Sequence, residues 1–278
     1  MKIGISADSI CDLTPELLEK YAIHLMPMVI TLDDQEYEDG ININQDQLFE
    51  FTEKTGRLPK TSARSSYEYI EHFEKLLQEY DHIIHFSISF KISSTGNNAV
   101  VASKELDSKV TVIDTKSLST GAGFLTISCA EKIEAGEKLE DIVAELEQEK
   151  EKIQASFLVD TLKFLHKGGR CSSLALLGAN LLKIKPRISL IDGEMKVTKK
   201  YIGNIEVSLI KYMNDLLKEC PPNKKRAFIT YSSFMPVANE IEQKLKEFGF
   251  KEVIQTFAGP TICTHCGKKT LGIIYEKE

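Results

Sequence analysis

The stretch HIIHFSISFKISSTGNNAVVASKELDSKVTVIDT, residues 82–115, decides the fold class. It opens with an apolar segment typical of a buried strand and closes with another, KVTVIDT, at residues 109–115. Between them, small polar residues lead into a segment that we interpret as a helix. A strand, a helix and a second strand in this order form the unit from which parallel sheets are built.

Other segments extend this pattern in both directions. KIGISAD, residues 2–8, is interpreted as a further buried strand, and Ser65 with Glu68 forms a capping box that opens another helix. In the second half, Asp192-Gly193 within PRISLIDGEMKV predicts a hairpin, which indicates a mixed sheet. The sequence thus predicts two α/β domains. Residues 1–155 should hold a mostly parallel sheet with helices on both faces, and residues 156–278 a mixed sheet.

Composition excludes several classes of function. The chain has 278 residues, 42% of them hydrophobic, and a formal net charge of -6, which argues against nucleic-acid binding. No apolar run reaches the roughly 18 residues needed to span a bilayer, so we expect no stable membrane insertion. The N-terminus lacks a secretory pattern, and we expect a cytoplasmic protein. The sequence has no glycine-rich nucleotide motif, and no cofactor is expected.

Two cysteines near the C-terminus, Cys263 and Cys266, form the one CxxC motif of the chain. A structural zinc site commonly needs a second such pair, which the other four cysteines do not form, so no metal is expected. His265, between the two cysteines, then remains as the candidate functional residue of this motif. On local sequence alone, a histidine in this position is more often structural.

Short hydroxyl side chains follow the expected strands or precede the expected helices. They are Thr61, Ser62, Ser93, Ser94 and Thr95. A helix start carries unsatisfied N–H groups and partial positive charge, so hydroxyls there suit one small anionic group. The same residues also serve as simple helix caps in many proteins, and local sequence leaves both readings open.

The motifs in their order resemble the DegV family over essentially the whole chain. DSICDLTPE resembles DST-x-DLP, PKTSARS resembles P-x-TSQPS, and ISFKISSTGNNA resembles ISSKLSGTYQSA. VIDT resembles VIDS, HKGGRCS resembles KGGRIS, IKPRISLIDGEM resembles IKP followed by DG, and THCGKKTLGI resembles THTGPGALGI. Departures from these patterns include Ser94 for glycine, Gly96 for tyrosine, and Cys266 and Lys268 for threonine and proline.

The resemblance implies a two-domain α/β fold that binds a long-chain fatty acid between its domains, with head-group-binding loops in the first. It implies a non-catalytic, acyl-carrying subunit of bacterial fatty acid kinase, whose ATP-binding subunit phosphorylates the carboxylate. Ser93 matches the carboxylate-binding serine, Thr61 shares that contact, Ser62 is its neighbour, and His265 joins from the second domain. Arg170 matches an arginine at a surface that meets the kinase.

Two alternatives stay open at this point. A hydrolase would use Ser93 as nucleophile and His265 as base, with Asp8 or Asp114 as the third member, although the chain lacks a G-x-S-x-G elbow. A carrier or sensor of another amphipathic acid would need no kinase. For a fatty acid, the apolar segment SSLALLGANLL, residues 172–182, is the expected wall of the tail tunnel.

Overall fold

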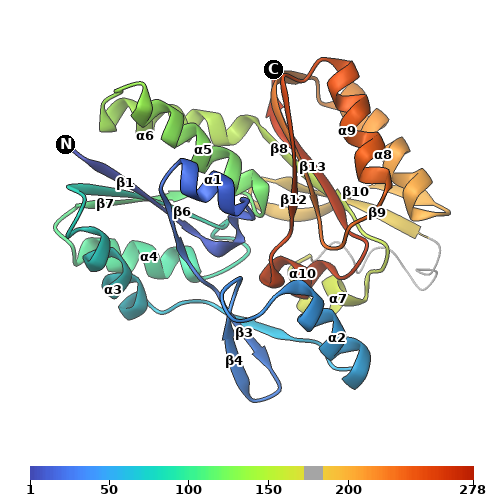
Figure 1. The fold of residues 1–278 in the computed structure, drawn as a ribbon, viewed down its shortest axis with the longest axis horizontal. Coiled ribbons are helices and arrows are strands. Elements are labelled where there is room, and N and C mark those ends of the chain that lie inside the picture. The colour runs from blue at the N-terminus through green and yellow to red at the C-terminus, as the bar shows by residue number, and fades with distance from the viewer. Residues whose placement is uncertain (172–183) are drawn as a thin grey trace.

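The computed structural model describes residues 1–171 and 184–278, which form three sheets (Figure 1). The first sheet has the order β2-β1-β6-β7, and all its strand pairs are parallel. Its strands are β1 (Ile3–Asp8), β2 (Ile23–Met26), β6 (His82–Ser87) and β7 (Val110–Asp114). Helix α4 (Thr95–Lys104) connects β6 to β7, so the predicted strand–helix–strand unit is confirmed.

Helices cover both faces of this sheet, as predicted. Helices α3 (Ser66–Leu76) and α4 lie below it in Figure 1, while α1 (Pro15–Lys20), α5 (Thr120–Glu134) and α6 (Leu139–Glu149) lie above it. The predicted capping box is present, because Ser65 Oγ accepts from the Glu68 amide and Glu68 Oε2 accepts from the Ser65 amide. Short 3-10 helices follow β1 (Ser9–Cys11) and α6 (Lys150–Lys152).

The second sheet is mixed, also as predicted, with the order β10-β9-β8-β13-β11-β12. Among its described strand pairs, β11–β12 is parallel and the others are antiparallel. Asp192 (φ 50°) and Gly193 (φ 78°) form the expected hairpin turn between β9 and β10. The strands are β8 (Ile153–Leu158), β9 (Ile184–Ile191), β10 (Glu194–Ile202), β11 (Pro222–Tyr231), β12 (Glu252–Phe257) and β13 (Leu271–Lys277).

Alternate residues of the mixed sheet enter two different cores. Ala155, Phe157 and Ile274 pack in the core shared with the first sheet. Leu158 and Ile273 face the other way, into a core under α8 (Ile205–Glu219) and α9 (Val237–Phe248). The larger core therefore joins both sheets. The division of the chain at residue 155 falls inside β8 and stays a prediction.

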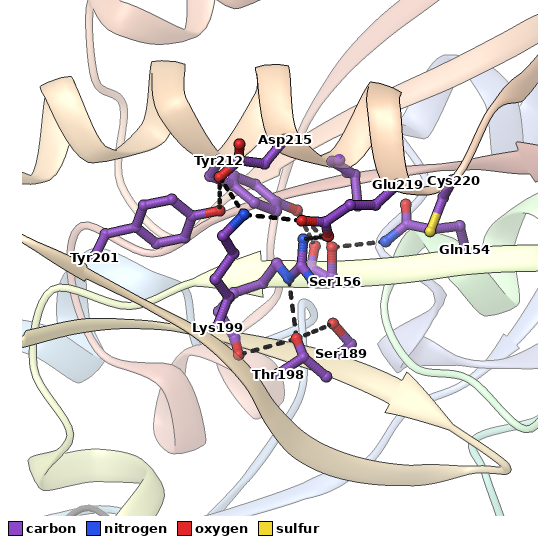
Figure 2. A network of polar contacts seen from close by, with 12 residues as sticks. Gln154, Ser156, Ser189, Thr198, Lys199, Tyr201, Tyr212, Asp215, Glu219 and Cys220 are labelled. Carbon is purple, nitrogen blue, oxygen red and sulfur yellow. Dashed lines mark hydrogen bonds and ion pairs between the residues drawn. The ribbon is translucent and has the colours of Figure 1, made fainter.

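A polar network lies on the α8 side of the mixed sheet (Figure 2). Lys199 Nζ lies 2.7 Å from Asp215 Oδ2 and 2.8 Å from Glu219 Oε1, and Tyr201 donates to Asp215 at 2.9 Å. The buried Tyr212 hydroxyl donates to the Ser156 carbonyl at 2.7 Å and accepts from the Ile273 amide at 3.2 Å. We call this set, which also includes the Arg187–Glu219 pair at 2.6 Å, the α8 network.

A third, small sheet was not expected. It has the order β4-β3-β5, with β3 (Val29–Leu32), β4 (Gln35–Glu38) and β5 (Lys60–Ser62). Thr61 and Ser62 thus lie in a strand and not in the loop that we predicted, because backbone pairing with β3 holds this polar segment extended. Helices α2 (Gln45–Thr55), α7 (Lys163–Gly168) and α10 (Pro260–Cys266) lie beside this sheet in Figure 1. The expected tunnel wall at 172–182 lies outside the described residues.

Candidate functional site

A cavity of about 220 Å³ lies between the first sheet and the mixed sheet. Aliphatic and aromatic side chains from both sheets and their loops form much of its wall, among them Ile10, Ile88, Phe157, Leu190, Met195 and Ile274. Five of the six predicted ligand-binding residues also line it: Thr61, Ser62, Ser93, Ser94 and His265. One cavity therefore combines an apolar wall with the predicted polar group.

Ser93 reaches the cavity from the loop between β6 and α4. Its amide donates to the Ser89 carbonyl at 3.2 Å, and its hydroxyl accepts from the Thr95 amide at 3.2 Å. Ser94 is the N-cap residue of α4, but its side chain makes no capping bond. The start of α4 thus brings partial positive charge and two serine hydroxyls to the cavity.

Thr61 and His265 meet although they are 204 residues apart. Strand β5 presents Thr61 and helix α10 presents His265, and the Thr61 hydroxyl lies 2.9 Å from His265 Nε2. The other ring nitrogen, Nδ1, is buried and has no hydrogen-bond partner among the described residues. The pair therefore forms a polar group with capacity left for one more partner.

The GGR motif packs against this histidine. A Cβ at Gly168 would lie 2.6 Å from His265 Nδ1, so only glycine allows the ring this close. Gly169 ends α7 with φ 68°, a left-handed conformation that glycine adopts without strain. Arg170 is exposed, lines the cavity, and donates from Nη1 to the Gly168 carbonyl at 2.6 Å.

His265 is held neutral at physiological pH. Burial and, to a smaller extent, the positive charge of Arg170 together lower the pKa of His265 to about 4. A neutral imidazole carries one proton, and the contact with Thr61 is compatible with either tautomer. His265 therefore acts in this site as a hydrogen-bonding group rather than as a cation.

Thr95 is the one predicted binding residue that does not line the cavity. Its buried hydroxyl lies 2.9 Å from the Tyr69 hydroxyl, which donates to Asp8 at 2.5 Å. Asp8 also accepts from Ser87 Oγ at 2.7 Å. Burial alone would raise the pKa of Asp8, but the nearby His85 ring, with Nε2 at 3.3 Å, and hydrogen bonds from Tyr69 and Ser87 hold it below the ordinary value. Thr95 thus anchors the start of α4 to this buried carboxylate.

Two buried carboxylates that we did not predict hold the start of α10. Asp12 accepts from the Gly259 amide at 2.8 Å, and Asp39 accepts from the Thr261 amide at 3.2 Å. Burial raises the pKa of Asp12 to about 8 and also raises that of Asp39. The motif DSICD contains Asp12, but a partner 247 residues away in the sequence leaves no local signal.

The departures at Gly96 and Cys266 have a local explanation. A Cβ at Gly96 would lie 2.2 Å from the Phe90 ring, so the Phe90 side chain occupies the space beside α4. Cys263 donates to the Ala258 carbonyl at 3.3 Å and Cys266 to the Gly267 carbonyl at 3.7 Å. Across residues 1–171 and 184–278, no group of three or more histidine, cysteine or acidic residues could hold a metal ion.

The candidate residues of a hydrolase triad form hydrogen bonds with residues outside the triad. His265 bonds Thr61, and Asp8 accepts from hydroxyls and the Ile88 amide. Asp114 accepts from the amides of Phe90 and Lys116. Among the described residues, neither carboxylate bonds to His265, so the histidine–carboxylate pair of a triad is not formed.

Comparison with known proteins gives consistent results. The DegV family model ("Uncharacterised protein, DegV family") matches residues 2–278. A DegV domain-containing protein of Clostridium perfringens is 30% identical, with 100% of this chain and 99% of that protein covered. In the described ranges, no helix is long and apolar enough to cross a membrane.

Solved structures share the fold over the whole chain. The fatty-acid-binding DegV family protein of Thermus thermophilus is 27% identical, with a TM-score of 0.91 and full coverage of both chains. DegV of Bacillus subtilis, described as a fatty acid binding protein, is 27% identical with a TM-score of 0.88 and full coverage of both. The fatty acid kinase B3 protein of Streptococcus pneumoniae, loaded with linoleic acid, is 21% identical with a TM-score of 0.87 and full coverage of both, which indicates a shared fold.

Proposed function

The chain belongs to the DegV family, and from this premise we propose that it binds a long-chain fatty acid between its two larger sheets. It then presents the carboxylate to a separate ATP-binding kinase subunit. The observation that carries the proposal is one cavity that combines an apolar wall with Thr61, Ser93 and His265. The fatty-acid-binding proteins of Thermus thermophilus and Bacillus subtilis, each 27% identical, support the same ligand class.

The polar residues suit a carboxylate. The Ser93 hydroxyl oxygen accepts from the Thr95 amide, and no acceptor among the described residues takes its proton, which is left to donate. If His265 donates from Nε2 to Thr61, the Thr61 hydroxyl keeps its own proton for a second carboxylate oxygen. Hydrogen bonds to a charged acceptor are stronger than neutral ones. Together with the start of α4, these two hydroxyls stabilise a negative charge.

The apolar wall suits the acyl tail. Burial of each methylene contributes about 0.8 kcal/mol before the cost of ordering the chain. Ile88, Phe157, Leu190 and Met195 come from four different segments that surround the cavity. A tail placed there lies in the core that joins the first sheet to the mixed sheet.

In this proposal, the ATP-binding kinase subunit carries out the phosphorylation of the carboxylate. The sequence carries no phosphate-binding loop, so ATP would bind to the kinase subunit. Arg170, exposed at the cavity and next to His265, is the proposed contact for that subunit. Ser62 and Ser94 border the same opening and complete the proposed ligand contacts. The encounter would take place in the cytoplasm, on a chain that itself performs no catalysis.

Native mass spectrometry tests the binding step. Protein freed of lipid is mixed with hexadecanoic acid or with hexadecanol, which has the same tail and no carboxylate. We expect a one-to-one complex with the acid that survives at collision energies which remove the alcohol. The proposal fails if the acid forms no complex.

A trapping assay tests the presentation step. Acid-loaded protein is incubated with ATP, Mg²⁺ and an ATP-binding fatty acid kinase subunit, and hydroxylamine converts any acyl phosphate to a hydroxamate. We expect hydroxamate only when both proteins are present. Acid binding without hydroxamate would instead identify the chain as a carrier or sensor.

A further inference from the structure

The cavity contains a buried hydroxyl that the protein leaves without a partner. Thr261, on α10, is 8% exposed and lines the cavity, and its Oγ1 has no hydrogen-bond partner among the described residues. Its amide donates to Asp39, and its side chain lies near enough to help lower the pKa of that carboxyl. The hydroxyl nevertheless lacks hydrogen-bond geometry toward Asp39, whose second oxygen accepts from Ser9.

A second hydroxyl on the same wall has spare capacity. Ser232 is fully buried and lines the cavity, and its hydroxyl accepts from the Thr270 amide at 3.1 Å. No acceptor within residues 1–171 and 184–278 takes the Ser232 proton. Thr230, by contrast, lies 2.6 Å from Thr120 Oγ1 and 2.9 Å from Thr256 Oγ1. Unfilled capacity is therefore not shared by every buried hydroxyl of this wall, since Thr230 is paired on both sides while Thr261 and Ser232 are not.

Thr261 lies close to the residues that would hold the carboxylate. It precedes His265 by four positions in α10, so both project from the same side of the helix. The separation along the axis is about 6 Å. An acid held at Thr61, Ser93 and His265 would thus pass Thr261 with the carboxyl-proximal part of its chain.

We propose that the ligand is an oxygen-substituted fatty acid, with a hydroxyl or oxo group near its carboxyl end that hydrogen-bonds Thr261. This inference rests on the proposed function and names the substrate class of the same site. A plain alkyl chain would leave the Thr261 hydroxyl buried and unpaired, which weakens binding by about 5- to 100-fold relative to a ligand that satisfies it. A hydroxyl on the ligand both donates and accepts, so it can pair with the Thr261 hydroxyl in either direction.

Calorimetric titration of the full chain tests the inference. The probes are hexadecanoic, 2-hydroxyhexadecanoic and 3-hydroxyhexadecanoic acid. We expect one of the two hydroxy acids to bind at least 5-fold tighter than hexadecanoic acid. The wild-type ratio is decisive by itself: equal or weaker binding of both hydroxy acids overturns the inference while the proposed function stands. If no acid binds, the proposed function fails, and this inference with it.

Two threonine variants locate the effect. Thr261→Val keeps the shape of the side chain and removes the hydroxyl, so the ratio of affinities should fall to about 1. Thr264→Val is the matched control, because Thr264 is 3% exposed on the same helix, its Oγ1 also has no partner in the described ranges, and it does not line the cavity. This control should keep the wild-type ratio. A preference that survives Thr261→Val overturns the assignment.

Discussion

Two polar clusters lie on opposite faces of the mixed sheet, and they differ in how fully their groups are paired. In the α8 network, Lys199, Tyr201 and Glu219 each pair within the cluster (Figure 2). In the cavity, His265 Nδ1 and Thr261 Oγ1 have no partner in the described chain. Because buried polar groups are nearly always hydrogen-bonded, an unpaired group on a residue that lines a cavity points to a partner that the cavity can hold. We conclude that the α8 network stabilises the fold, whereas the cavity residues are arranged for a ligand.

The strongest test of this contrast removes one hydroxyl from the α8 network. Tyr212→Phe leaves the Ser156 carbonyl and the Ile273 amide without their partner in a fully buried position. We expect the free energy of unfolding to fall by about 2–4 kcal/mol, while the affinity for hexadecanoic acid changes less than 2-fold. Urea denaturation and calorimetry give the two values. A stable variant that fails to bind the acid would reverse the assignment.

The second prediction concerns the pH dependence of the free energy of unfolding, which depends on His265 on the cavity side of the mixed sheet. The pKa of His265 is about 4 in the folded protein, because of burial and Arg170, and ordinarily about 6.5. As pH falls below 6.5, the unfolded chain binds a proton that the folded protein does not, so stability decreases until about pH 4. Between pH 7 and pH 5 this one group costs about 2 kcal/mol.

Urea denaturation at the two pH values, with and without His265→Gln, isolates this contribution. The variant should lose about 2 kcal/mol less stability than the wild type on going to pH 5. A bound carboxylate favours the protonated ring, so acid-loaded wild type should also lose less. Equal losses in wild type and variant would show that His265 is not held neutral by its surroundings.

A smaller effect is expected when one hydrogen bond to the carboxylate head group is removed and the fold is left intact. Ser93→Ala removes a donor to the carboxylate, so hexadecanoic acid should bind about 10- to 30-fold more weakly, while the affinity for hexadecanol stays unchanged. Ser189→Ala is the control on the other face of the mixed sheet, because the Ser189 hydroxyl lies 2.7 Å from Thr198 Oγ1, which accepts from Arg187 of the α8 network. It should leave both affinities at their wild-type values. Equal weakening of acid and alcohol by Ser93→Ala would mean that Ser93 does not contact the carboxylate.

The smallest effect on acid binding is expected at the rim of the cavity. Ser62 lines the cavity but is exposed, so water can replace its contact with a ligand. Ser62→Ala should weaken acid binding by less than about 3-fold. If Ser62→Ala weakened acid binding as much as Ser93→Ala, the carboxylate would have to lie closer to β5 than proposed.

Much of the fold could be predicted because its signals are local. Apolar segments, the capping box at Ser65 and the Asp192-Gly193 turn identified both larger sheets. Strand β5 was missed because Lys60–Ser62 has neither apolar alternation nor β-branched continuity, and only its pairing with β3 defines it. Helix α10 was missed as well, since its seven residues lack the apolar spacing of a longer helix.

Only part of the candidate site could be predicted from the sequence. No local pattern links Thr61 to His265 across 204 positions, and the resemblance to a family supplied that link. Thr95 looked equivalent to Ser93 in sequence, but adjacent residues at a helix start point in different directions, and Thr95 faces Tyr69. The unpaired state of Thr261 depends on tertiary packing and could not be predicted from the sequence.

A crystal structure of the complex with hexadecanoic acid tests the central claim most directly. It should place one carboxylate oxygen within hydrogen-bonding distance of Ser93 Oγ and the other within that distance of Thr61 Oγ1, with the tail along Phe157 and Met195. A carboxylate bound away from these hydroxyls, or a cavity that remains empty at saturating acid, would contradict the account.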